Sequence, residues 1–271
     1  MIKFGKLVGL TSGRKRLPML VWLLFGVSIG VVGGYMAARA HKSTKANVVV
    51  VKQTSTEDKT LGASSVSYAG DKILPVPYLH QEYRQSCEAA SLRMALKYKG
   101  IDTTDMQLLK LFGYNPRHRD MTKNVWDDPE QMFVGDVTGG QAEGEGYGVY
   151  STAVAKIGPQ IGRELQSVKG VTAQTVAKAI YEGNPVIAWG YWNTESKADS
   201  WKTVDGKTVQ AVLKAHVRLV YGVQGSLENP TAFLVHDPFT EDRTRTPWPT
   251  VKLMDQFKKF GAATDQMVIV K

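Results

Sequence analysis

The chain has 271 residues, 43% of them hydrophobic, and a formal net charge of +9 at pH 7. Eight of the 34 Lys and Arg residues, and none of the 25 Asp and Glu residues, fall in residues 1–45, so the remainder carries 26 basic and 25 acidic residues. This balance lacks the basic patch of nucleic-acid-binding domains, and we expect no nucleic-acid partner. A single cysteine excludes a zinc site built on cysteine ligands, and we expect neither a metal nor a cofactor.

The N-terminal part of the sequence has the pattern of a membrane-targeting segment. Residues 17–38 carry no charge over a length that matches the ~20 residues needed to span a bilayer. Five basic residues precede this segment and three follow it closely, which predicts a cytoplasmic segment at 1–16 and a chain that continues outside the cell. The apolar run exceeds the ~7–15 residues of a cleaved signal peptide, so we predict a single-pass anchor in the cell membrane. The alternative is secretion after cleavage near Ala40.

Residues 39–72 are rich in Ser, Thr, Lys and Ala, and we interpret them as a linker. Residues 73–271 then form one domain of about 200 residues, enough for a single substantial core. Because compartments outside the cytoplasm are oxidising, exported proteins usually carry paired cysteines. One unpaired thiol in such a protein is reactive, paired between molecules, or buried.

The single cysteine, Cys87, lies at the start of a predicted helix in the segment LPVPYLHQEYRQSCEAASLRMALKYKGI, residues 74–101. Ser86 is placed to cap this helix and Gly100 to end it. The free N–H groups and the dipole of a helix start favour a reactive thiolate. Gln81 carries an amide that can donate a hydrogen bond to a developing oxyanion. The alternative is that Cys87 is a small buried hydrophobic residue.

Apolar periodicity predicts further helices in the first half of the domain and one near the end. They cover residues 106–112, 151–165, 172–181 and 252–260. Between them, residues 135–148 read GDVTGGQAEGEGYG. This glycine-rich segment lacks the Lys-Ser/Thr ending of a phosphate-binding loop, so we interpret it as a flexible surface loop and not a nucleotide site.

The second half of the domain has the pattern of a sheet. Short apolar runs predict strands over residues 185–192, 216–223, 231–237 and 267–270, and an Asp-Gly pair predicts a hairpin turn at 204–207. Helices followed by antiparallel strands indicate the α+β class.

A cysteine nucleophile needs a base, and the base needs a group that orients it. In the predicted hairpin of residues 216–237 we expect Val220 to pair with Phe233. Equal stepping along both strands then places His216 opposite Asp237, with the two side chains on the same face about 5 Å apart. His236 is one residue off and faces the other side. The pattern predicts that His216 is the base and that Asp237 orients it.

Four segments resemble papain-like cysteine peptidases: VPYLHQEYRQSCEAASLRMALKYKGI, GNPVIAW, AHVRLVYGV and FLVHDPF. The chain is most similar to the bacterial family related to the bacteriocin-leader-processing (double-glycine) peptidases. The resemblance implies a papain-like fold, with the Cys helix in an N-terminal helical part and an antiparallel sheet in the C-terminal part. It implies that Cys87 is the nucleophile and that Gln81 contributes to the oxyanion hole. It also implies that His216 is the base and that Asp237 orients the imidazole.

One position departs from the family pattern. The family often has Gly-Pro after the cysteine, where this chain has Glu88 and Ala89. A carboxylate beside the nucleophile opposes thiolate formation unless it points into solvent or takes a separate partner.

We therefore predict an outward-facing thiol hydrolase that cleaves peptide or isopeptide bonds, with a peptide or cell-wall peptide as its substrate. Two alternatives remain open from the sequence. One is a catalytically inactive papain-like binding module at the cell surface, and the other is a transglutaminase-like acyl transferase.

Overall fold

The computed structural model describes residues 68–240 and 245–271. The predicted cytoplasmic segment, the predicted anchor at 17–38 and most of the predicted linker lie outside these residues. Within the part that is described, no helix combines the length and the apolar character needed to cross a bilayer.

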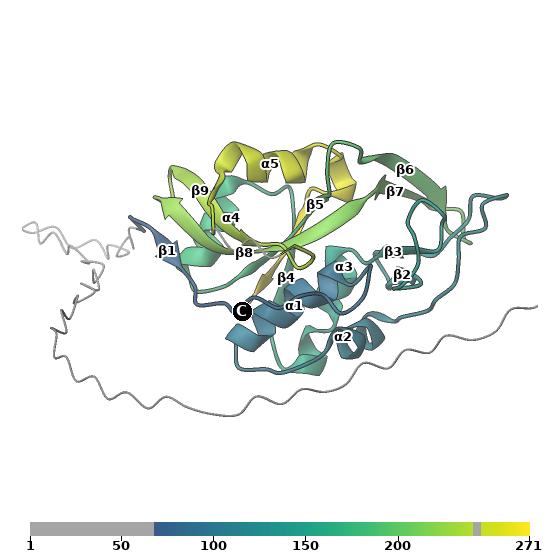
Figure 1. Ribbon diagram of the computed structural model, residues 1–271, viewed down its shortest axis with the longest axis horizontal. Coiled ribbons are helices and arrows are strands. Elements are labelled where there is room, and N and C mark those ends of the chain that lie inside the picture. The colour runs from purple at the N-terminus through teal and green to yellow at the C-terminus, as the bar shows by residue number, and fades with distance from the viewer. Residues whose placement is uncertain (1–67, 241–244) are drawn as a thin grey trace, which may run out of the picture. The chain divides into compact units, whose positions relative to one another are not determined.

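A seven-stranded sheet organises the domain, with each strand antiparallel to its neighbours (Figure 1). The strand order is β10-β9-β8-β5-β11-β4, with β1 also paired to β8. The strands are β1 (Lys72–Ile73), β4 (Leu165–Lys169), β5 (Val186–Tyr191), β8 (Ala215–Gly225), β9 (Pro230–His236), β10 (Trp248–Pro249) and β11 (Gln266–Val270). Every residue of β5 is buried, so the middle of the sheet is covered on both faces.

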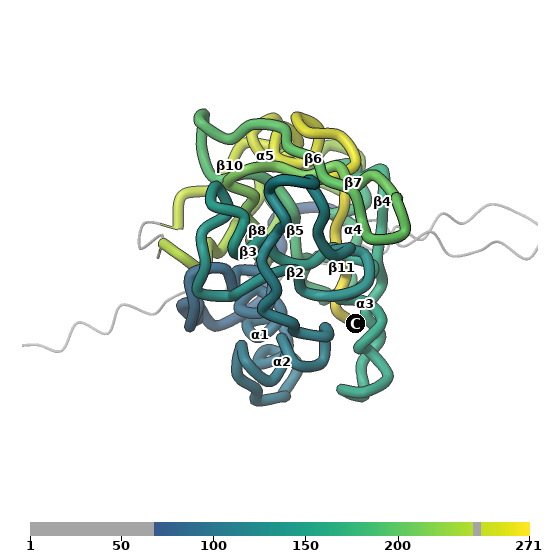
Figure 2. Tube along the Cα trace, turned by 90° about the vertical axis from the view of Figure 1, so that its right-hand side faces the viewer, coloured from purple at the N-terminus to yellow at the C-terminus, as the bar shows by residue number. Residues whose placement is uncertain are grey.

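The helices are α1 (Cys87–Tyr98), α2 (Asp105–Phe112), α3 (Ser151–Lys156), α4 (Ala173–Tyr181) and α5 (Thr250–Lys258), with 3-10 turns at Gly158–Ile161 and Gly261–Ala263. Helices α1 to α3 lie on one side of the sheet and α5 on the other (Figures 1 and 2). All residues of α1 from Cys87 to Leu96 are buried, because this helix lies between β8 and α2. The α+β expectation is confirmed.

The helix predicted over 151–165 is wrong beyond residue 156. Pro159 has no N–H to donate and disfavours helical backbone at Gly158, so the chain continues as a short 3-10 turn. Gly162 ends that turn in a left-handed conformation, with φ of 66°. The next segment, Leu165–Lys169, is strand β4.

Two small sheets stand beside the large one. Strand β6 (Lys197–Lys202) pairs with β7 (Thr208–Leu213) across the predicted Asp-Gly turn, in which Gly206 has a φ of 87°. Strand β2 (Val134–Gly135) pairs with β3 (Gly146–Gly148).

The glycine-rich segment is not the surface loop that we expected. A Cβ atom at Gly135 would lie 2.4 Å from the Glu145 carbonyl oxygen, and one at Gly148 would lie 2.2 Å from Glu88 Oε1. Backbone at these positions packs too closely for any side chain. The two glycines therefore reflect close packing, of Gly135 against Glu145 and Trp126 and of Gly148 against Glu88 of the Cys helix.

Candidate active site

Cys87 is the first residue of α1, and it is buried. Ser86 occupies the N-cap position, but the expected cap is absent because its hydroxyl has other partners. That hydroxyl donates to Asp105 Oδ2 at 2.6 Å and accepts from the Tyr83 N–H at 3.0 Å. The first-turn amides of α1, including that of Cys87, are thus left without a side-chain cap.

A buried ionic cluster fixes the loop that leads into Cys87. Asp105, at the start of α2, is fully buried and accepts from the Glu82 N–H at 2.7 Å. Arg93 of α1 pairs with Asp105 at 3.1 Å and also with the Glu82 carboxylate. The cluster therefore ties the Gln81-to-Ser86 loop to two helices, so the position of the loop relative to the nucleophile is set by packing.

The register between β8 and β9 differs by two residues from the expected one. Val220 pairs with Val235, not with Phe233, and Leu219 pairs with His236. Continuing this register places Asp237 beside Arg218, two residues along β8 from His216. Because the shift is an even number, His216 and Asp237 still lie on the same face. The expected pairing of Val220 with Phe233 is wrong, but the expectation that His216 and Asp237 share one face is confirmed.

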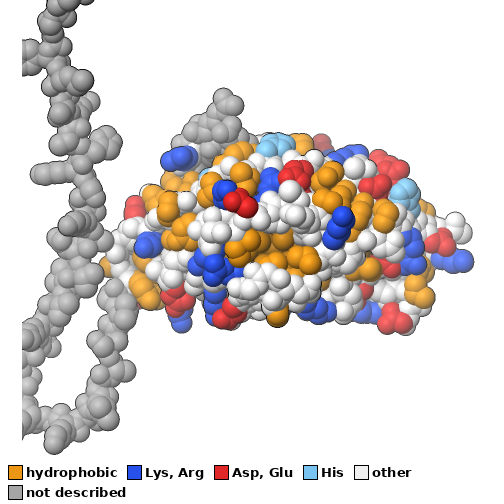
Figure 3. Space-filling model, turned by 90° about the horizontal axis from the view of Figure 1, so that it is seen from below, with side chains coloured by type: hydrophobic (Ala, Val, Ile, Leu, Met, Phe, Trp, Pro, Cys, Tyr) orange, Lys and Arg blue, Asp and Glu red, His pale blue; other side chains and the backbone are white. Residues whose placement is uncertain are grey.

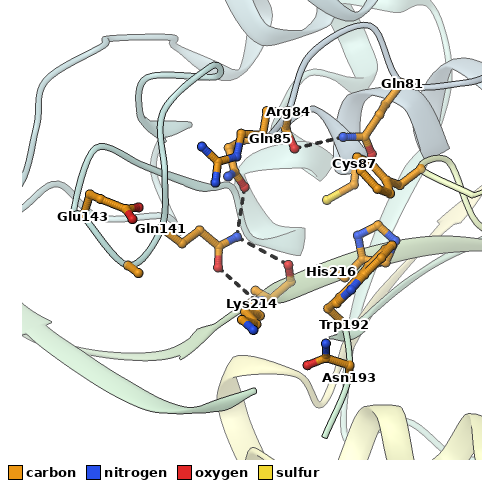
Figure 4. Close-up of a pocket in the computed structure, with 13 residues that line it drawn as sticks. Gln81, Arg84, Gln85, Cys87, Gln141, Glu143, Trp192, Asn193, Lys214 and His216 are labelled. Atoms are coloured by element: carbon orange, nitrogen blue, oxygen red, sulfur yellow. Dashed lines mark hydrogen bonds between the residues drawn. The ribbon is translucent and has the colours of Figure 1, made fainter. Parts of the chain in front are cut away.

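His216 and Asp237 form a buried hydrogen-bonded pair, with Nε2 and Oδ1 2.8 Å apart. Since the Asp237 carboxylate accepts, Nε2 carries the hydrogen, and a neutral imidazole leaves Nδ1 as an acceptor. Figure 4 shows the His216 ring next to the Cys87 side chain in the cleft that both line. The structure thus brings these predicted residues together, in an arrangement that suits a proton acceptor beside a thiol.

Arg218 is a partner that the sequence reasoning missed. Its Nε donates to Asp237 Oδ2 at 2.7 Å, and its Nη1 donates to the Tyr191 carbonyl and to Gln256 Oε1, both at 3.1 Å. Burial opposes ionisation of Asp237, but the His216 hydrogen bond and the His216 and Arg218 charges outweigh it and hold the pKa of Asp237 well below its ordinary value. The available signal was the spacing, because Arg218 lies two positions after His216 on the same strand face.

The surroundings of both partners of the expected proton transfer favour their neutral forms. Burial, followed by the Arg218 charge, lowers the pKa of His216 to about 4, against the opposing influence of Asp237. Burial, followed by the Glu88 charge, raises the pKa of Cys87 well above its ordinary value. The Trp192 ring stands edge-on to the imidazole, with centroids 4.7 Å apart, and helps to exclude water. These shifts favour a neutral thiol beside a neutral imidazole over a preformed ion pair.

The Glu88 carboxyl group is buried, and one of its two partners is the nucleophile itself. Its Oε1 accepts from the Val149 N–H at 3.1 Å, and its Oε2 accepts from the Cys87 thiol at 3.3 Å. Burial raises the pKa of Glu88 to about 7, against the opposing hydrogen bonds that it accepts. The carboxylate thus lies against the nucleophile, in the orientation that opposes thiolate formation.

Gln81 lines the cleft with Cys87, but its amide hydrogens are already used. Nε2 donates to the Tyr83 carbonyl at 2.7 Å and to the Arg84 carbonyl at 2.9 Å, whereas Oε1 is buried without a partner. The two carbonyls fix this orientation, because exchanging the amide atoms would bring three oxygens together. To donate to an oxyanion, Gln81 must release at least one of these bonds.

His236 lies on the opposite face of β9, as expected. Its Nε2 is 3.1 Å from the Val76 carbonyl oxygen, and its ring stacks on Tyr221 with centroids 4.0 Å apart. It is separated from the cleft that His216 lines.

The cleft above Cys87 has a volume of about 440 Å³. Its lining combines residues from the loop before α1 and the start of α1, the glycine-rich segment, the segments after β5 and β7, the start of β8 and the loop after β9: Gln81, Arg84, Gln85, Cys87, Gln141, Ala142, Glu143, Trp192, Asn193, Lys214, Ala215, His216 and Phe239. Gln141 joins two of these walls, because it accepts from the Ala215 N–H at 3.1 Å and donates to Gln85 Oε1 at 3.0 Å (Figure 4). The segment interpreted as a surface loop therefore forms one wall of the cleft.

Comparison with known proteins identifies the family of the chain. The model of the "Peptidase_C39 like family" matches residues 73–265. The chain belongs to this family. Its membership supports a cysteine peptidase kind of function and confirms the resemblance drawn from the sequence segments.

Among solved structures, a protein of Bacillus anthracis assigned as a C39-like peptidase has a TM-score of 0.60 at 22% identity, over 74% of this chain and 98% of that one. It shares the fold. The peptidase domain of Streptococcus ComA, a bifunctional ABC transporter of a quorum-sensing pathway, has a TM-score of 0.39 at 14% identity, over 72% of this chain and 97% of that domain.

The uncharacterized protein YvpB of Bacillus subtilis (strain 168) is 29% identical over 139 residues, which is 50% of this chain and 53% of YvpB. The chain thus spans about half the length of this curated relative.

Proposed function

We propose that this protein is a thiol hydrolase that cleaves peptide or isopeptide bonds, with Cys87 as nucleophile, His216 as base and Asp237 as the residue that orients it. The observation that carries the proposal is the buried His216–Asp237 hydrogen bond, which presents an acceptor nitrogen next to Cys87 in the cleft. The family of the chain supports the same kind of chemistry.

In the proposed reaction, His216 Nδ1 takes the thiol proton as the Cys87 sulfur attacks the carbonyl carbon of the scissile bond. The tetrahedral intermediate collapses when Nδ1–H gives this proton to the leaving amine, and the acyl group remains on sulfur. Water, deprotonated by the same nitrogen, then releases the acid and restores the thiol. Asp237 stays ionised throughout and stabilises the imidazolium.

The developing oxyanion needs donors within hydrogen-bond reach. The Cys87 N–H belongs to the uncapped first turn of α1, and its position supports this role. Gln81 is proposed as the second donor, after it gives up its bond to the Tyr83 or Arg84 carbonyl. The unpartnered Oε1 leaves the side chain free to make that exchange without losing a bond on its oxygen.

We further propose that the hydrolase faces outward and that residues 17–38 anchor it in the cell membrane. The support is the uncharged length of this segment and the excess of Lys and Arg before it. Peptides and cell-wall peptides outside the cell are then the accessible substrates. Membrane fractionation and protease protection of intact cells test this arrangement, and release of a shortened protein into the medium would indicate cleavage near Ala40.

The deciding experiment on the chemistry is Cys87→Ala in the full chain. Hydrolysis of a peptide library and of purified cell wall is measured beside labelling by an iodoacetamide probe. We expect both hydrolysis and labelling to disappear, because the variant has no other thiol. If hydrolysis persists in the folded variant, Cys87 is not the nucleophile.

One observation favours a second candidate function, a binding module without turnover. The thiol at rest is neutral and held by a carboxylate, which is unlike an activated nucleophile. A binding module would capture peptides without cleaving them, and with the same affinity in Cys87→Ala as in the unmodified chain. Isothermal titration of non-hydrolysed library peptides against both proteins separates the two functions.

A further inference from the structure

The Glu88 carboxyl group is held in place from both of its oxygens. Oε1 accepts from the Val149 N–H and Oε2 accepts from the Cys87 thiol. Gly148 allows this close approach only because it has no Cβ, which would lie 2.2 Å from Oε1. The residue is 5% exposed and therefore buried. A buried acidic group therefore touches the atom that is proposed to attack the substrate.

No cation balances this carboxylate within residues 68–240 and 245–271, where Glu88 forms no ion pair with Lys or Arg. From α1 it faces Cys87, and from the β3 side it faces the Val149 N–H and the buried Tyr147 phenol. From β8, His216 and the Val217 amide lie near the same thiol, and beyond β9 the Asp237 charge acts on it. The Glu88 charge is therefore offset only by N–H donors and by the thiol hydrogen.

The thiol hydrogen can point in only one direction at a time. In the described part of the chain it is shared with Glu88, and no hydrogen bond joins Cys87 to His216. An ionised Glu88 competes with Nδ1 for this hydrogen. A protonated Glu88 does not compete for the thiol hydrogen, and its own O–H can donate a hydrogen bond to the sulfur.

We propose that Glu88 controls the protonation state of the nucleophile. When ionised, Glu88 accepts the thiol hydrogen and holds Cys87 as a neutral thiol; when protonated by solvent, it donates to the sulfur and stabilises the thiolate. The Glu88 O–H bond forms with a proton from solvent, and the Cys87 S–H bond breaks when its proton leaves to solvent, so one proton is taken up for each proton released. The proposal rests on the proposed function only in taking Cys87 as the nucleophile.

Burial places this change close to neutral pH, because it raises the pKa of Glu88 to about 7. Below that pH the neutral acid favours the thiolate, and above it the carboxylate adds to the burial that already raises the pKa of Cys87. As pH rises through about 7, Glu88 ionises, and its negative charge makes the Cys87 thiol harder to deprotonate. Thiolate should stop increasing in this range and increase again only at higher pH.

The test is the rate of Cys87 alkylation by iodoacetamide against pH, in the full chain and in Glu88→Gln. Glutamine keeps the shape and the acceptor for Val149, and its amide donates to sulfur at every pH. We expect the logarithm of the unmodified protein's rate to flatten near pH 7 and that of Glu88→Gln to rise in one step. The variant should be about tenfold faster or more at about pH 8 and nearly equal at about pH 5.

Glu130→Gln is the matched control, since it removes a carboxylate that pairs with Lys169 outside the cleft. It should follow the unmodified protein at every pH. A rate ratio for Glu88→Gln that is independent of pH overturns the proposal, as does a slower variant. If Glu88→Gln does not fold, the unmodified profile alone decides, because a steady tenfold rise per pH unit through pH 7 overturns the proposal.

Alkylation requires no substrate and no turnover. A chain that shows the pH signature but hydrolyses no peptide would retain this inference and lose the proposed function. A chain that hydrolyses peptides with a featureless alkylation profile would do the reverse.

Discussion

Each ring nitrogen of His216 has a separate task, and the partner of Nε2 decides what Nδ1 can do. The bond to Asp237 places the hydrogen on Nε2 and leaves Nδ1 as the acceptor. Arg218 secures the other carboxylate oxygen, so the carboxyl group cannot swing away from the imidazole. With a neutral thiol as its neighbour, this imidazole must act as a true general base during attack.

Substitution of His216 and of His236 tests the assignment of the base. His216→Ala should lower kcat by about 10³-fold or more, because it removes the base, whereas His236→Ala should leave kcat within about twofold. Asp237→Ala should cost less than His216→Ala, because the imidazole can still sample the active orientation and the carboxylate does not itself take the proton. Steady-state kinetics on any peptide that the chain cleaves provides the measurement.

Circular dichroism and thermal unfolding show whether each histidine variant folds. Loss of activity in a folded His236→Ala, with activity retained in His216→Ala, would mean that the β8 face has been assigned the wrong way round.

The sequence contained enough information to locate Cys87, His216 and Asp237, because each stands at the end of an element and end positions follow from periodicity. It did not contain the pairing register. A bulge near Tyr221 shifts the register of β8 against β9 between Val220 and Gly222, and no local sequence pattern predicts this bulge. The direction of Glu88 was equally hidden, since its nearest neighbours come from a segment about 60 residues later.

At the scale of elements, the main difference from expectation is the segment between β2 and β3. Glycine and polar residues are typical of surface loops, and that composition misled the interpretation. Here the glycines permit close packing, and Gln141 fastens the segment to Gln85 and to Ala215, the residue before His216. Helix α3 ended early for a similar reason, because the backbone rules of Gly158 and Pro159 overrode an apolar pattern.

This arrangement gives an element-scale prediction for Gln141→Ala. The change leaves Gln85 Oε1 and the Ala215 N–H without their partner, which should lower the free energy of unfolding by about 1–3 kcal/mol. One wall of the cleft loosens, so KM should rise more than kcat falls. Urea unfolding and steady-state kinetics measure both effects.

Gln160→Ala is the control for this prediction, since Gln160 is exposed on the 3-10 turn after α3 and should alter neither quantity. If kcat fell while KM stayed constant in Gln141→Ala, the residue would act on the base next to it and not on the wall.

For the whole molecule, the surface and the buried site have different electrostatics. Figure 3 shows basic and acidic side chains interspersed on the face seen from below. This agrees with the near balance of charge beyond residue 45, and a mixed surface produces no large field of one sign. The strong electrostatic effects are instead concentrated around Cys87, where burial shifts the pKa values of Glu88 and His216 in opposite senses.

These two shifts predict an unusual dependence of stability on pH. The pKa of Glu88 is raised from 4.5 to about 7, so its contribution is complete below 4.5 and is lost as pH rises to 7. The pKa of His216 is lowered from 6.5 to about 4, so its contribution is complete above 6.5 and is lost as pH falls to 4. The two contributions change in opposite directions where their pH ranges overlap, so the free energy of unfolding should be nearly constant between about pH 4.5 and 6.5.

Glu88→Gln removes one of the two slopes. Its unfolding free energy should rise by about 3 kcal/mol between about pH 4 and pH 6.5, where the unmodified protein stays level. Urea titrations across this range make the comparison, with Glu130→Gln as the control that should remain level. Parallel curves for the unmodified protein and Glu88→Gln would contradict the assignment of a raised pKa to Glu88.

The place of β11 in the sheet sets an order of events during synthesis. This strand lies between β5 and β4, although it is the last of the described strands to leave the ribosome. Until Met267 to Ile269 arrive, β5 has no neighbour on that side and β4 has none at all. Cys87 and His216 are thus synthesised well before the strand that completes the sheet. The sheet that supports the proposed site is therefore completed by the segment that is synthesised last among the described strands, so we expect the site to form only after residue 270 has left the ribosome.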